Sequence, residues 1–111
     1  MNERARLAYY LDFYGDLLTE KQRQAIDLHV NEDFSLSEIS DEMGSSRQAV
    51  HDLIHRASQK LADFEDKLGL YALLQTHQNQ LERIKQLLQQ MGVEDRIEYR
   101  KILDIMDEII Y

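Results

Sequence analysis

Two histidines one helical turn apart, in the stretch VHDLIHRASQKL, are the residues of this chain whose types and spacing most resemble a chemical site. His51 and His55 would share one face of a helix, as a pair of zinc ligands must. Zinc peptidases of the HExxH pattern carry a glutamate after the first histidine, whereas this chain has the shorter Asp52. The other histidines, His29 and His77, fall in other predicted helices, and nothing in the sequence brings either to the pair. We therefore expect no metal or other cofactor here. The remaining alternatives are a solvated helix surface and a surface that reads nucleic acid.

The composition is that of a small protein with one domain, or with one domain and an appendage. The chain has 111 residues and no cysteine, which excludes disulfides and thiolate metal sites and suits a reducing compartment. Its first residues, MNERARLAYYLDFYGDLL, are charged from the start, unlike a secretory signal. No apolar run approaches the about 18 residues that a membrane span needs. We expect a cytoplasmic protein with no membrane span.

Acidic residues outnumber basic ones in all but one segment of the chain. The net charge of −8 argues against a protein that coats nucleic acid without selectivity. Residues 1–44 contain ten acids and four bases, and residues 63–111 contain ten acids and six bases. Residues 45–62 contain one acid and three bases, so the histidine pair lies in the single basic segment.

The chain is predicted to be all-α, because it has no proline, four glycines and few β-branched residues in alternation. Capping boxes at 19–22 and 35–38 predict the starts of two helices. Apolar periodicity adds a helix over about 3–14 and long helices from about residue 47 onward. Gly92 is predicted to stop a long helix, and a last helix is expected over 93–110.

Residues 35–61 have the pattern of a helix-turn-helix. A short helix ends at Gly44, a serine at 45 or 46 caps the next helix, and that helix starts near Arg47. Its apolar side is expected to pack inward and consists of Val50, Ile54, Ala57, Leu61 and Phe64. The opposite side carries Gln48, Asp52, His55 and Gln59, with His51 and Arg56 flanking them.

Beyond residue 62, two amphipathic helices with a short joint suggest an antiparallel hairpin. Their apolar stripes exceed what the preceding bundle can cover, so they are also the predicted interface of a homodimer. The candidates for either role are Tyr71, Leu74, Leu81, Ile84, Leu88, Ile102, Ile105 and Ile109. The pattern leaves both roles open. The expected division of the chain is an N-terminal helix over 1–17, the helix-turn-helix over 18–62 and a helical extension over 63–111.

Residues 18–61 resemble region 4 of bacterial sigma factors, the part that reads promoters with a helix-turn-helix. The likeness is carried by LTEKQR at 18–23, EI at 38–39, MG at 43–44 and IHRA at 54–57. The chain is not a whole sigma factor, because the polymerase-binding region 2 is missing. In its length, its tyrosine-rich first helix and its acidic tail, the chain is similar to the YlxM-like proteins of Gram-positive bacteria. These are small helix-turn-helix proteins tied to the signal recognition particle.

The resemblance implies a non-enzymatic regulator in the signal recognition particle pathway that binds nucleic acid, with DNA ahead of RNA but the choice left open. The start of the second helix of such a motif enters the major groove. The predicted nucleic-acid-binding residues are Ser46, Arg47, Gln48, His51, Asp52, His55, Arg56 and Lys60. No nucleophile–base set or glycine-rich phosphate loop indicates catalysis. The alternative is a protein-interaction adaptor whose acidic surface binds protein components of the particle.

Overall fold

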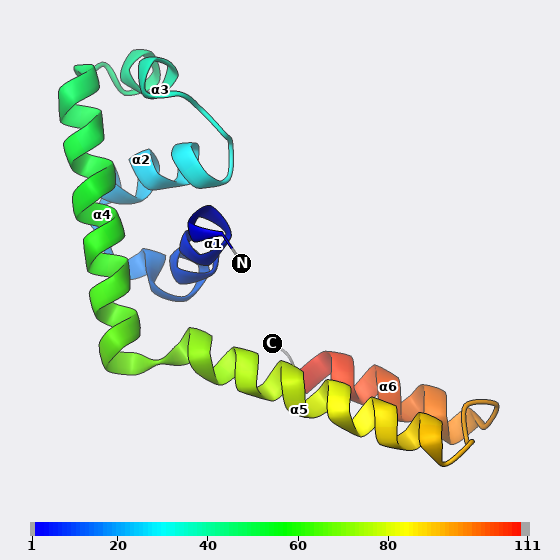
Figure 1. The fold of residues 1–111 in the computed structure, drawn as a ribbon. Coiled ribbons are helices and arrows are strands. Elements are labelled where there is room, and N and C mark those ends of the chain that lie inside the picture. The colour runs from blue at the N-terminus through cyan, green and yellow to red at the C-terminus, as the bar shows by residue number, and fades with distance from the viewer. Residues whose placement is uncertain (1, 110–111) are drawn as a thin grey trace. The chain divides into compact units, whose positions relative to one another are not determined.

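The computed structural model describes residues 2–109, and these residues form helices joined by short turns (Figure 1). The predicted all-α fold is confirmed. The expectation that the last helix reaches residue 110 falls outside the described residues. The helices are α1 (Glu3–Tyr14), η1, a 3-10 turn (Gly15–Leu17), α2 (Glu20–Val30), α3 (Leu36–Met43), α4 (Arg47–Leu68), α5 (Leu70–Gln90) and α6 (Ile97–Ile109). The chain divides into two compact units between residues 71 and 72.

Local hydrogen bonds set the starts of the helices where the sequence predicts them. Thr19 and Ser35 each accept the amide of the residue three positions on, and the side chain of that residue reaches back, so both capping boxes form. Ser46 caps α4 by accepting the amide of Ala49 at 3.1 Å. Gly44 ends α3 with a φ of +64°, a left-handed conformation that glycine adopts without a side-chain clash.

The core of the first unit lies where α1, α2 and α4 meet (Figure 1). The buried residues of this cluster are Leu11, Tyr14, Leu18, Ile26, Val30, Ala57 and Leu61. The predicted inward side of α4 supplies Ala57 and Leu61 to this cluster, and Ile54 and Phe64 pack against it half-buried. Val50, on the same side of α4, is also fully buried. This side is therefore committed to packing, which leaves the rest of α4 to face solvent.

Tyr14 joins α1 to the end of α4 and the start of α5. Its hydroxyl donates to Glu65 Oε1 at 2.7 Å and accepts the Leu70 amide at 3.0 Å, and Glu65 Oε1 also accepts the amide of Tyr71 at 2.9 Å. Burial, aided by the hydrogen bond to Glu65, raises the pKa of Tyr14 to about 12. The hydroxyl therefore keeps its proton, and its role as donor, throughout the physiological range.

Replacing Tyr14 with phenylalanine is expected to destabilise the protein by about 1–3 kcal/mol, because the Leu70 amide and the Glu65 carboxylate each lose a partner in a partly buried place. Urea unfolding followed by circular dichroism measures the change. Tyr10→Phe is the matched control, since the Tyr10 ring packs against Tyr71 but its hydroxyl makes no hydrogen bond to a described residue. Equal losses in the two variants would contradict the assignment.

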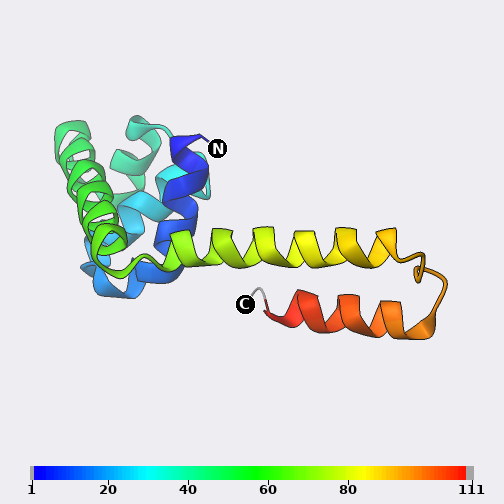
Figure 2. The ribbon, with the colours of Figure 1, turned by 60° about the horizontal axis from the view of Figure 1, so that its bottom comes forward.

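In the second unit, α5 and α6 run side by side in opposite directions, as Figures 1 and 2 both show. Leu81 of α5 faces Leu103 and Met106 of α6 around a small hollow. The prediction that the last helix begins at residue 93 is wrong, because α6 begins at Ile97. Gly92 has a φ of +70°, and the chain uses residues 91–96 to make the turn between the helices.

Candidate nucleic-acid interface

The turn between α3 and α4 is closed by hydrogen bonds around Ser40. The backbone amides of Gly44 and Ser45 both donate to the Ser40 carbonyl, the latter at 3.1 Å. The Ser40 hydroxyl in turn donates to the carbonyl of Ser45. Ser45 is thus half-buried and bound through its backbone. These bonds fix the direction in which α4 leaves α3.

The first turns of α4 border a hollow that also touches α3. Arg47, Gln48 and His51 line it together with Leu36, and its volume is about 440 Å³. Ser46 caps the helix by accepting the Ala49 amide, which leaves the amides of Arg47 and Gln48 in helical geometry without an acceptor among residues 2–109. Amides in this position attract anions such as phosphate. The hollow therefore combines a cation, an amide side chain and a helix start.

The cations of α4 are available to a ligand. Arg56 could have paired with Asp52, and Lys60 with Asp63, across one helical turn. Among residues 2–109 neither pair forms, and Arg47 has no ion-pair partner there either. Lys60 makes only a 3.4 Å hydrogen bond to Gln22 Oε1.

Acidic side chains of the first unit reduce the positive charge that is available to a ligand. Arg4 and Arg23 are already bound to Asp33 and Asp16 at 2.6 and 2.7 Å. Asp52 accepts a hydrogen bond from Gln48 at 3.0 Å and lies 3.5 Å from His51 Nδ1. The carboxylate therefore opposes a phosphate near the start of α4, while Arg56 and Lys60 further along the helix form no ion pair with any residue that the structure describes.

The eight predicted binding residues are all exposed, but they do not share one face of α4. At about 100° per residue, the pair His51 and His55 points about 140° away from the pair Arg56 and Lys60 around the helix. The histidines lie on the side of α1 and the end of α2, whereas Lys60 reaches the start of α2. A ligand bound by all of them would have to wrap around the helix.

A larger groove, of about 580 Å³, lies along α4 beside the first turn of α1 and the last turn of α2. His51 and His55 line it, and so does His29, which was not expected to lie near the pair. Within residues 2–109, no three histidine or acidic side chains are arranged to hold a metal ion. The groove thus gathers three of the four histidines without forming a metal centre.

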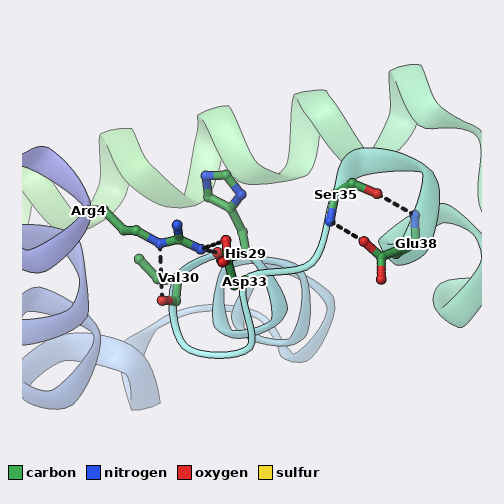
Figure 3. A network of polar contacts seen from close by, with 6 residues as sticks. All are labelled: Arg4, His29, Val30, Asp33, Ser35 and Glu38. Carbon is green, nitrogen blue, oxygen red and sulfur yellow. Dashed lines mark hydrogen bonds and ion pairs between the residues drawn. The ribbon is translucent and has the colours of Figure 1, made fainter.

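Arg4 holds the end of α2 in place beside this groove. Its guanidinium donates to the carbonyls of His29 and Val30, at 2.6 and 3.3 Å, and to Asp33 Oδ1 at 2.6 Å (Figure 3). These carbonyls belong to the last turn of α2 and lack helical partners of their own. Arg4 therefore satisfies the end of α2, and the histidine at that end is positioned by a bond from α1.

The predicted interface residues fall into three groups. Tyr71 packs against the rings of Tyr9 and Tyr10 in the first unit and is only 7% exposed. Leu74 and Leu81 are buried, and Leu88 and Ile102 are half-buried. Ile84, Ile105 and Ile109 are the exposed ones, at 45%, 57% and 55%. In the single chain, only this last group offers a largely free apolar surface.

No helix among the described residues is both long and apolar enough to cross a membrane.

Comparison with known proteins gives consistent matches along the chain. A family model described as "Putative helix-turn-helix protein, YlxM / p13 like" matches residues 1–104. A UPF0122 protein of Halalkalibacterium halodurans is 36% identical over 98% of both chains, and one of Oceanobacillus iheyensis is 38% identical over 94% of this chain and 99% of its own. A UPF0122 protein of Clostridium kluyveri is 54% identical over 70 residues, which is 63% of each chain.

Proposed function

Because the chain belongs to the UPF0122 family of YlxM/p13-like helix-turn-helix proteins, we propose that it is a non-enzymatic regulator that binds nucleic acid through α3 and α4. The observation that carries the proposal is that the one basic segment of the chain lies on α4 of the helix-turn-helix, where Arg47, Arg56 and Lys60 are exposed and form no ion pair within residues 2–109. A surface that keeps its positive charge free of internal partners is suited to a polyanion.

In this proposal the start of α4 enters the major groove of DNA. Arg47 is placed to reach guanine or a phosphate, and Gln48 to pair with adenine, from the edge of the hollow that they share. Arg56 and Lys60, further along the helix, contact the phosphate backbone, as does the amide end of α4. Asp52 lowers the affinity for any phosphate nearby. It therefore favours selective binding over non-selective binding to the phosphate backbone.

The test is binding of labelled genomic DNA fragments and of the RNA of the signal recognition particle, measured by fluorescence anisotropy over a series of salt concentrations. With three cations on the surface, we expect the logarithm of the binding constant to fall with the logarithm of salt at a slope of about −2 to −3 per chain. Absence of binding even at low salt would refute the proposal.

The hairpin of α5 and α6 supports a homodimer. Leu73, Ile84 and Leu87 on α5 are exposed, as are Ile105 and Ile109 on α6. At about 100° per residue, the exposed residues of α5 lie to one side of the buried Leu81, and those of α6 lie to the same rotational side of the buried Met106. Because the two helices are antiparallel, this places both rows on one flank of the hairpin. A continuous apolar flank of this kind is typical of an interface, and a second copy would bury it while doubling the cations that face the nucleic acid.

Ile105→Glu is expected to convert the dimer to a single chain, because a carboxylate would be placed in the apolar interface without a partner. Light scattering during size-exclusion chromatography gives the mass. Arg100→Glu, an exposed position on the opposite flank of α6, is the control and should keep the dimer. A wild-type protein with the mass of one chain would show that the flank has another use.

We further propose that the regulator acts in the cytoplasm, in the signal recognition particle pathway, as its likeness to YlxM-like proteins suggests. A second candidate, an adaptor that binds basic proteins of the particle, is favoured by the exposed acids of α6, such as Asp104, Asp107 and Glu108. Affinity capture from the host with and without nuclease separates the two. Partners that are lost with nuclease support the nucleic-acid proposal, and a protein partner that survives supports the adaptor.

A further inference from the structure

The rings of His51 and His55 are parallel and stand apart. Their centroids are 6.5 Å from each other, and their planes differ by 1°. Both side chains are exposed, and both line the groove of about 580 Å³ between α4, the start of α1 and the end of α2. Both rings therefore border a groove of the size that small ligands use.

A base held between the two rings needs a gap of about two stacking distances. Bases stacked along a strand are about 3.4 Å apart, so a base lying between two flat groups separates them by about 6.8 Å. The ring centroids are 6.5 Å apart, and because the planes are parallel this distance is the largest gap that the two planes can have. Both side chains are exposed, so a small rotation of either ring would admit a base. Histidine is among the side chains on which proteins stack unpaired bases.

The walls of the groove suit the edges of a base. Leu7 and Ile54 supply apolar surface, and Asn2, Ser58 and Gln59 supply donors and acceptors at its rim. The amide and hydroxyl groups can pair with the edge of any base, as in proteins that hold unpaired nucleotides. The groove therefore offers both stacking and hydrogen bonds to a planar heterocycle.

The charges around the groove make a phosphate a poor anchor there. Arg4, its one arginine, is already bound to Asp33. Glu3 also lines the groove, and Asp52 lies beside His51. Stacking thus has to hold the ligand, while phosphates are left to the unpaired cations elsewhere on α4.

We propose that this groove binds an unpaired nucleobase of a nucleic acid strand, held between the rings of His51 and His55. The inference rests on the proposed function and adds to it that the ligand contains a looped, flipped or single-stranded nucleotide. Because His51 also borders the hollow at the start of α4, the base would lie next to the part of the strand that Arg47 and Gln48 contact.

The experiment compares a labelled single-stranded oligonucleotide, the blunt duplex of the same sequence and a strand of equal length made of abasic sites. His55→Ala is the main variant, since His55 lines the groove but not the hollow at the start of α4. We expect it to weaken binding of the single strand about 5- to 100-fold, and to weaken binding of the duplex and of the abasic strand far less. His55→Phe, which keeps a flat ring, should restore most of the affinity.

His77→Ala, on α5, is the matched control and should change nothing. An equal loss for single strand and duplex, or no loss for either, would overturn the inference while leaving the proposed function in place. Displacement of the strand by micromolar adenosine monophosphate would also overturn it, because the site would then serve a free nucleotide. Failure of the wild-type protein to bind any of the three nucleic acids would refute both the inference and the proposed function.

Discussion

The double substitution Arg47→Glu/Arg56→Glu is expected to reduce the affinity for nucleic acid at least about 100-fold. A hydrogen bond to a charged group contributes about 1.5–3 kcal/mol, and each 1.4 kcal/mol is a tenfold change in affinity. Neither arginine forms an ion pair within residues 2–109. Replacing them therefore breaks no internal ion pair whose freed acidic partner could offset the loss of affinity. The salt dependence should fall as well, by a slope of about 2 per chain.

Arg83→Glu/Arg100→Glu is the control for this experiment. It makes the same change in net charge at exposed positions of α5 and α6, which are not part of the helix-turn-helix. The opposite change, Asp52→Asn, removes the carboxylate from the start of α4 and should raise the affinity. If the control lost as much affinity as the α4 variant, binding would depend on total charge, and α4 would not be the reading surface.

Leu61→Ala is expected to remove about 2–5 kcal/mol of stability from the first unit. Leu61 is fully buried, in the cluster where α1, α2 and α4 meet, and an alanine would leave a cavity there. A unit of 71 residues has about 4–10 kcal/mol in total, so the loss would be a large share of its stability. Urea unfolding followed by tyrosine fluorescence measures it, since Tyr9, Tyr10 and Tyr14 lie in this unit.

Leu68→Ala makes the same change of side chain on the same helix, but at a position that is 57% exposed. Its effect should stay within about 0.5 kcal/mol. Similar losses for the two variants would mean that the packing of Leu61 is not what holds α4 to α1 and α2. Nucleic-acid binding should be unchanged in Leu68→Ala, which separates loss of the fold from loss of the binding surface.

The sequence by itself determined where most helices begin and end. Thr19, Ser35 and Ser46 cap the helices that follow them, and Gly44 ends the helix before it, as predicted. These signals act between residues at most four apart, so they can be read without knowledge of the rest of the chain. The same is true of the inward side of α4, because the apolar residues recur at the spacing of one helix face. The start of the last helix was missed, since the turn over 91–96 carries no cap as clear as these.

The tertiary structure decided which side chains meet. His29 is 22 positions before His51 along the chain, and only the packing of α1, α2 and α4 brings both to one groove. Packing also decides that the histidine side of α4 meets α1 and the end of α2, while Lys60 meets the start of α2. Among the apolar residues of α5 and α6 it determines that Leu81 is covered while Ile84 and Ile105 are exposed. The physical reason is that a helix start depends on a few neighbouring atoms, whereas the distance and angle between helices depend on how side chains from distant segments fill the space between them.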